Sequence, residues 1–151
     1  MEQYYELANQ IHRELCVIPA PSHYEDRRAA YCAEKLKAFG FERIFIDEAK
    51  NVICELKTEK TDQTVIFAAH TDVVFPDMDP LPLREDDEKI YCPGCGDDTV
   101  CVAQLMSVMK KVKDAGKEPS CNVVFVLNSC EEGLGNLKGI RAVMERYKDS
   151  V

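Results

Sequence analysis

The stretch from residue 64 to residue 72, Thr-Val-Ile-Phe-Ala-Ala-His-Thr-Asp, constrains the fold of this chain most strongly. Five apolar residues run without interruption from Val65 to Ala69, which predicts a strand that is buried on both faces. His70 and Asp72 follow directly where this strand should end. In an open α/β sheet, ligands bind just beyond the carboxyl ends of the strands, so these two side chains are candidates for a binding site.

A second apolar stretch, residues 122–128, repeats this pattern and is followed by Ser129, Cys130, Glu131 and Glu132. Its run of valine, phenylalanine and leucine also predicts a buried strand. We expect the two strands to deliver their polar side chains to one crevice at the same edge of the sheet.

The rest of the chain predicts alternating helices and strands. The apolar spacing predicts helices at residues 2–17, 24–38, 99–115 and 137–147, a hairpin at 41–57 and a short strand at 89–91. Ser22 stands three residues before Glu25 and predicts a capping box at the start of the second helix. This alternation predicts an α/β fold, a three-layer sandwich with a mostly parallel sheet.

Charge and composition exclude several functional classes. The net charge is −8 and no cluster of Lys and Arg appears, so we expect no nucleic-acid partner. No apolar run approaches the roughly 18 residues of a membrane span, so we expect no membrane partner. The acidic first residues do not resemble a signal peptide. Eight cysteines without such a signal predict reduced thiols and a cytoplasmic location.

His70 and Asp72 are residue types that occur in zinc sites. Zinc binds histidine nitrogen and carboxylate oxygen, and a catalytic zinc keeps one position open for water. A carboxylate usually holds the other ring nitrogen of a ligating histidine, and Asp72 lies two residues from His70. Taken alone, however, a His-x-Asp pair at a strand end is more often structural or merely exposed.

Further carboxylates follow at the expected element boundaries. Asp97, with Asp98 beside it, comes after a glycine-rich bend at a predicted helix start, where it can bridge two metals. Glu131 and Glu132 are adjacent and point in different directions, so one can bind metal while the other holds a proton. Taken singly, the aspartates suit a helix N-cap and the glutamates suit a solvated loop. The order of the three groups along the chain weakens these alternatives.

This ordered combination resembles the M20-type metallopeptidases, a family of two-zinc aminopeptidases, carboxypeptidases and deacylases. The motifs that carry the resemblance are His70-Thr71-Asp72, Gly96-Asp97-Asp98 and Glu131-Glu132-Gly133. The segments 15–22, 40–42 and 51–53 are similar to the family's opening helices and hairpin, so the resemblance covers nearly the whole chain. The Asp97-Asp98 doublet looks more like the peptidase T branch than the branch with Asp-Met-Lys, and the resemblance implies a cis peptide bond between its two residues.

The resemblance also implies a zinc-exopeptidase-like (phosphorylase/hydrolase-like) fold, a mechanism and a role for each residue. Two Zn²⁺ ions, or Co²⁺ or Mn²⁺, would be held by His70, by Asp97 as the bridging ligand and by Glu132. Asp72 would orient His70, and Glu131 would be the general base that takes a proton from the attacking water. The implied substrates are short peptides for an exopeptidase or N-acyl amino acids for a deacylase.

The sequence also departs from the family pattern. Family members carry two more metal ligands downstream, an Asp and a His, and a lid domain involved in dimerisation, whereas the histidines here are His12, His23 and His70. We therefore expect residues 1–151 to be the N-terminal portion of a catalytic domain, without the lid and the C-terminal catalytic part. Alone, this incomplete domain should bind metal weakly, show little or no activity and self-associate through exposed sheet surface.

Two rival interpretations remain open. Cys92-Pro-Gly-Cys95 can be a redox pair or half of a zinc site, although the sequence holds no second Cys-x-x-Cys. The chain can also be a non-catalytic interaction domain built on a degenerate peptidase half.

Overall fold

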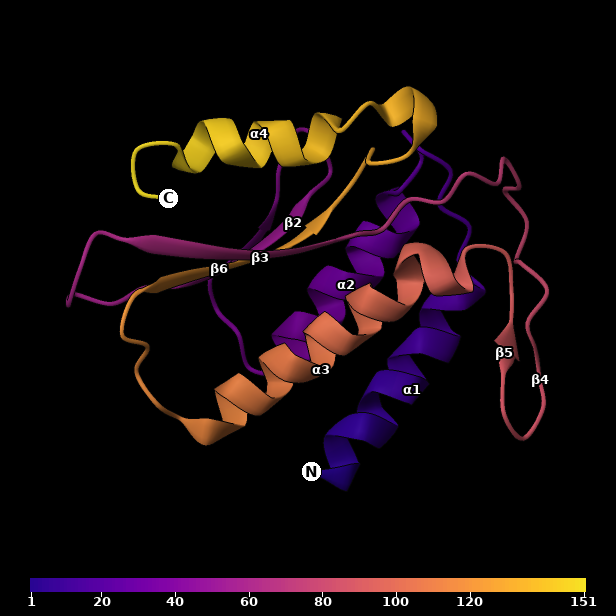
Figure 1. The fold of residues 1–151 in the computed structure, drawn as a ribbon, viewed down its shortest axis with the longest axis horizontal. Coiled ribbons are helices and arrows are strands. Elements are labelled where there is room, and N and C mark those ends of the chain that lie inside the picture. Colours follow the sequence, from indigo (N-terminus) through magenta and orange to yellow (C-terminus); the bar gives the residue numbers. More distant parts are fainter.

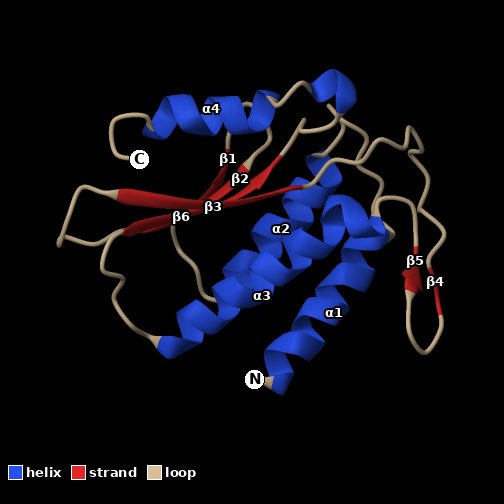
Figure 2. Ribbon diagram, in the orientation of Figure 1, coloured by secondary structure: helices blue, strands red, loops and turns tan.

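The computed structural model describes residues 1–151 as a three-layer α/β sandwich around a four-stranded sheet (Figures 1 and 2). One face of the sheet is covered by α1 (Glu2–Cys16), α2 (Asp26–Ala38) and α3 (Val100–Ala115). The other face is covered by α4 (Lys138–Tyr147). The predicted helices and the three layers are therefore confirmed. None of the helices combines the length and apolar content that a membrane span needs.

The sheet is mixed rather than mostly parallel. It contains β1 (Ile44–Ile46), β2 (Val52–Leu56), β6 (Asn122–Asn128) and β3 (Thr64–His70), in that spatial order. Only β3 and β6 run parallel, whereas β1–β2 and β2–β6 are antiparallel. The reason is the short links, because residues 47–51 and 57–63 reverse the chain and are too short for a parallel crossover. A separate small hairpin joins β4 (Arg84–Glu85) to β5 (Ile90–Tyr91), and its first strand was not predicted.

β3 lies at the edge of the sheet, so the prediction that both of its faces are buried was wrong. Val65 is 43% exposed and Phe67 is 49% exposed, although Phe67 stacks on Phe125 at a ring-centroid distance of 5.7 Å. The apolar run predicts that the segment packs against a core, but it does not determine how many strands flank it. The prediction holds for β6, which lies between β2 and β3.

Both faces of β6 contribute to a core. Phe125 and Leu127 belong to the larger apolar cluster, which also contains Leu15 of α1, Leu36 of α2 and Met106 of α3. The alternate residues of β6 belong to a smaller cluster under α4, formed by Ile53, Val124, Val126, Val143 and Tyr147. Because successive side chains of a strand point to opposite faces, these two cores fix the register of β6 and the position of its carboxyl end.

Candidate metal centre

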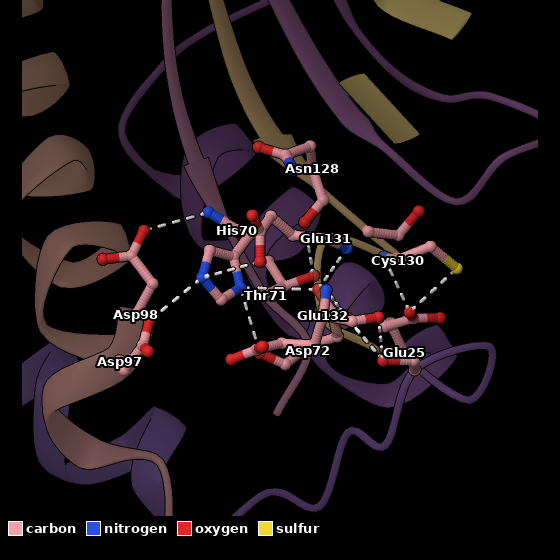
Figure 3. Close-up of polar contacts among 12 residues, drawn as sticks. Glu25, His70, Thr71, Asp72, Asp97, Asp98, Asn128, Cys130, Glu131 and Glu132 are labelled. Carbon is pink, nitrogen blue, oxygen red and sulfur yellow. Dashed lines mark hydrogen bonds and ion pairs between the residues drawn. The ribbon is translucent and has the colours of Figure 1, made fainter. Parts of the chain in front are cut away.

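The candidate site lies where β3 and β6 end. The parallel register pairs His70 with Asn128, so the residues that follow both strands emerge at the same edge of the sheet. Figure 3 shows the side chains after the two strands turned toward one another, with the segment before α3 beside them. The predicted convergence of the two strand ends is therefore confirmed.

His70 is the centre of this group. Its Nδ1 lies 3.4 Å from Oδ1 of Asp72 and 3.2 Å from the Asp72 carbonyl oxygen. Its Nε2 lies 3.2 Å from Oδ1 of Asp97 and 3.8 Å from Oε2 of Glu131. One ring nitrogen is thus held by the buried carboxylate, and the other faces the open side of the site. This is the arrangement of a histidine that binds metal through Nε2.

Asp72 is completely buried and fully used as an acceptor. Its two oxygens accept hydrogen bonds from the backbone N–H of Glu131 at 2.9 Å, from that of Glu132 at 3.0 Å and from the Ser22 hydroxyl at 2.6 Å. A single carboxylate therefore fixes the imidazole of His70 and the backbone that carries both glutamates. It can position ligands, but it has no free oxygen for an ion.

The two glutamates complete the group. One ligand atom from each of His70, Glu131 and Glu132 lies within 4.8 Å of the others, which is close enough for these groups to belong to one metal centre. Asp97 contacts this group through its ion pair with His70, and its side chain is 80% exposed. The structure therefore brings together all five residues named from the sequence.

The Asp97–Asp98 doublet does not cap a helix. No side chain caps α3, and Oδ2 of Asp98 instead accepts a hydrogen bond from the backbone N–H of His70 at 3.1 Å. The peptide bond between the two aspartates is cis, as the family resemblance implies. The segment before α3 is thus tied directly to the end of β3.

Three supporting residues were missed in the sequence. The spacing of Ser22 and Glu25 predicts a capping box, but the Ser22 hydroxyl donates to Asp72 instead, and α2 starts at Asp26 without a side-chain cap. Glu25 is buried, and its Oε1 accepts hydrogen bonds from the backbone N–H groups of His23 at 2.9 Å and Cys130 at 3.0 Å. A polar residue that serves a distant strand end leaves no local signal in its own segment.

Arg28 is the third missed residue and is 1% exposed. Its guanidinium donates to the carbonyl oxygens of Ile18 at 2.7 Å and Thr71 at 2.9 Å, and to Oγ1 of Thr99 at 3.0 Å. It therefore connects the loop before α2 with the segment after β3 and the start of α3. Neighbouring Arg27 is exposed, so the sequence alone did not separate the two arginines.

The charges of the site act on each other's protonation. Burial alone lowers the pKa of His70, but the hydrogen bond and charge of Asp72, with the charges of Asp98 and Glu131, raise this pKa to about 9. Burial alone raises the pKa of Asp72, but its hydrogen bonds, chiefly that from His70, lower the pKa to about 2. Burial, and then the charge of Asp97, raise the pKa of Glu132. A cation at this centre would relieve the excess negative charge.

We predict that the metal-free chain loses stability as the pH rises from about 6.5 to 9. The folded state holds the His70 proton up to about pH 9, whereas the unfolded chain releases it near pH 6.5. The stabilisation is therefore complete below pH 6.5 and lost as the pH passes through 9. Urea unfolding across this range measures the effect, and His70→Asn should show a flatter profile. An equally steep fall in this variant would contradict the assignment.

The donor set fits a divalent transition metal. One imidazole and several carboxylates form a mixed nitrogen and oxygen site, which suits Zn²⁺, Co²⁺ and Mn²⁺. The side chains of Asp97 and Glu131 are 80% and 38% exposed, so solvent and small molecules can reach the cluster.

The chain matches one known family in sequence. The profile of peptidase family M20/M25/M40 matches residues 66–150, which include the ends of β3 and β6 and all five site residues. No curated protein matches the chain.

Solved structures with the same fold include an aminopeptidase PepT from Bacillus cereus (23% identity, TM-score 0.70), covering 91% of this chain and 39% of that one. The match to a tripeptidase from Staphylococcus aureus (22% identity, TM-score 0.67) covers 92% of this chain and 40% of the tripeptidase chain. The match to human carnosine dipeptidase 1 (19% identity, TM-score 0.75) covers 98% of this chain and 36% of the dipeptidase chain. The chain therefore spans about two fifths of the length of these enzymes.

Proposed function

Because the chain belongs to peptidase family M20/M25/M40, we propose that it is the N-terminal portion of the catalytic domain of a two-metal exopeptidase for short peptides. The observation that carries this proposal is the clustering of His70, Glu131 and Glu132 within 4.8 Å at the shared edge of β3 and β6. The lid domain and the rest of the catalytic domain would lie outside residues 1–151. Eight free cysteines suit a reducing compartment such as the cytoplasm.

In this proposal, His70 would hold one metal ion, Glu132 would hold the second, and Asp97 would be the ligand that both share. Bound divalent ions would supply an acidified water and would polarise the carbonyl group of the scissile amide. Glu131 then accepts the proton of the attacking water and returns it to the leaving amine. Its Oε2 lies 3.8 Å from Nε2 of His70, so the proposed base stands beside the proposed metal ligand.

Asp72 acts through His70 and through the backbone of both glutamates, so we assign it a positioning role. Because Asp72 is buried just after β3, it is held in place and would not compete for the ion. The electrostatics support this role, because the charge that holds His70 is itself stabilised by three hydrogen-bond donors besides the imidazole.

We propose that residues 1–151 alone do not turn over substrate, because the resemblance implies an additional Asp and His ligand and no histidine follows His70. Hydrolysis of a tripeptide and of an N-acetyl amino acid, with Zn²⁺, Co²⁺ or Mn²⁺ present, tests this. We expect no release above that of Glu131→Gln. Release that depends on Glu131 would contradict inactivity, and the substrate cleaved would distinguish an exopeptidase from a deacylase.

The catalytic assignment is tested in a chimaera in which residues 1–151 replace the matching part of the Bacillus cereus aminopeptidase, with which they share the fold at a TM-score of 0.70. We expect tripeptide hydrolysis, lost in the same chimaera carrying Glu131→Gln. A folded, metal-loaded chimaera without hydrolysis would contradict the assignment and favour a non-catalytic interaction domain.

A self-association of the isolated chain through β3 is also proposed. β3 is an edge strand without a lysine, aspartate, glutamate or proline that would block pairing with a second copy. Val65 of this strand is 43% exposed. We predict that Val65→Lys shifts the chain toward monomer in sedimentation velocity. Ile46→Lys is the matched control, because Ile46 is 45% exposed on the opposite edge strand, β1. Equal effects of both substitutions would contradict the role of β3.

A further inference from the structure

A cavity of about 380 Å³ opens beside the candidate metal centre, between three loops. Its walls come from residues 21–24 after α1, from residues 73, 74 and 76 after β3, and from residues 132–134 after β6. Glu132, which the proposed function assigns to a metal ion, belongs to the third wall. The cavity is therefore continuous with the metal centre and is not a separate feature of the surface.

Backbone contacts hold these walls together. Val73 is the one buried lining residue, and it is 1% exposed. Its backbone N–H donates to the carbonyl oxygen of Ala20 at 2.9 Å, and it forms a parallel bridge with Pro21. The Ser22 hydroxyl lies 3.5 Å from the carbonyl oxygen of Glu132 and joins the first wall to the third. The cavity is thus preformed, and a ligand does not have to order its walls.

The side chains around the cavity favour an apolar ligand. Val74 is 63% exposed, Tyr24 is 60% exposed and Leu134 is 93% exposed, so three large side chains present apolar surface to solvent around one hollow. No lysine or arginine lines the cavity, and Glu132 is its only carboxylate. An acidic ligand group would find no cation there, and a basic one would compete for the proposed metal ligand. An apolar group would instead remove exposed apolar surface from water.

We propose that this cavity binds an apolar side chain, such as that of leucine, on the substrate residue that carries the scissile carbonyl. This assignment rests on the proposed exopeptidase function. There, Glu131 returns its proton to the leaving amine, so the amine half of the substrate lies on the Glu131 side of the centre. The residue on the carbonyl side then lies toward Glu132, where the cavity begins. A volume near the lower end of the roughly 300–1,000 Å³ of ligand pockets suits one side chain rather than a whole peptide.

Methyl NMR of the metal-free chain, with labelled valine and leucine, tests the cavity without the metal centre. L-Leucinamide carries the apolar side chain, and glycinamide is the matched probe without it. We expect L-leucinamide to cause saturable shifts of the Val74 and Leu134 methyl resonances and to leave those of Val143, in the core under α4, unchanged. Glycinamide should cause no saturable shift. Equal shifts with both probes, or none with L-leucinamide, would overturn the proposal.

Hydroxamates connect the cavity to the proposed function, because a hydroxamate group binds zinc. The chain is titrated with Zn²⁺ present in a Cys92→Ser/Cys95→Ser background, which excludes zinc binding by these thiols. Leucine hydroxamate should bind at least about tenfold more tightly than glycine hydroxamate, because its side chain is buried. Val74→Asp should abolish this preference and retain glycine hydroxamate binding. The matched control is Val108→Asp, at a valine that is 51% exposed on α3, and it should keep the preference.

The two measurements separate a failure of the cavity from a failure of the metal assignment. If neither hydroxamate binds but L-leucinamide still shifts Val74 and Leu134, the metal assignment fails and the apolar cavity stands. If both hydroxamates bind with equal affinity, the metal assignment stands and the role of the cavity is overturned. A preference for leucine hydroxamate that survives Val74→Asp would also overturn it.

Discussion

Replacement of Arg28 by alanine is expected to lower the free energy of unfolding by about 3 to 5 kcal/mol. The guanidinium is 1% exposed and donates to the carbonyl oxygens of Ile18 and Thr71 and to the hydroxyl of Thr99. Each buried carbonyl that loses its donor costs about 1 to 3 kcal/mol, and the empty volume adds to this. Urea unfolding of the metal-free chain measures the change.

Arg27→Ala is the matched control, because Arg27 is the adjacent residue of α2 and is exposed. It should change stability by no more than about 0.5 kcal/mol. Arg28→Lys keeps the charge but cannot span the three acceptors with a planar fork, so it should remain destabilising. Similar values for Arg27→Ala and Arg28→Ala would show that Arg28 does not connect the segments of the site.

Replacement of Asp72 by asparagine is expected to weaken Zn²⁺ binding at the candidate metal centre by about 10- to 100-fold. The carboxylate holds Nδ1 of His70 and accepts the backbone N–H groups of Glu131 and Glu132. An asparagine of the same shape would place an NH₂ group against one of these donors and would withdraw the negative charge from His70. Calorimetric Zn²⁺ titration in a Cys92→Ser/Cys95→Ser background isolates this centre from the thiols.

The matched control for this change is Asp79→Asn, which neutralises an exposed aspartate in the loop after β3. Because it removes the same charge at a distance, it should leave Zn²⁺ affinity unchanged. Ser22→Ala removes one of the hydrogen bonds to Asp72 and should have a smaller effect than Asp72→Asn. If Asp79→Asn weakened binding as much as Asp72→Asn did, the effect would be general electrostatics rather than positioning.

The features that sequence reasoning predicted are those with a local cause. Apolar runs predicted β3 and β6, and helical spacing predicted all four α-helices within a few residues. The site residues could be named because His70 and Glu131 come within three residues of the ends of such runs, and parallel strand ends share one edge of the sheet.

The features that it missed depend on contacts between distant segments. The mixed sheet and the exposed edge of β3 follow from the order of the strands, which an apolar run does not predict. Ser22 lies 50 residues from Asp72 in the chain, and its local context suggested a helix cap instead. The meeting of Cys92 with Cys16 likewise requires the packing of α1 against a turn 76 residues away.

The central claim is that the ends of β3 and β6 form a metal site, and Zn²⁺ titration of Cys92→Ser/Cys95→Ser with and without His70→Ala tests it most directly. With the thiol turn removed, the remaining Zn²⁺ affinity should be weak but measurable, and His70→Ala should reduce it by at least about tenfold while the fold is retained. If the Cys92→Ser/Cys95→Ser chain is folded and binds no Zn²⁺, or binds it equally well without His70, the claim is contradicted.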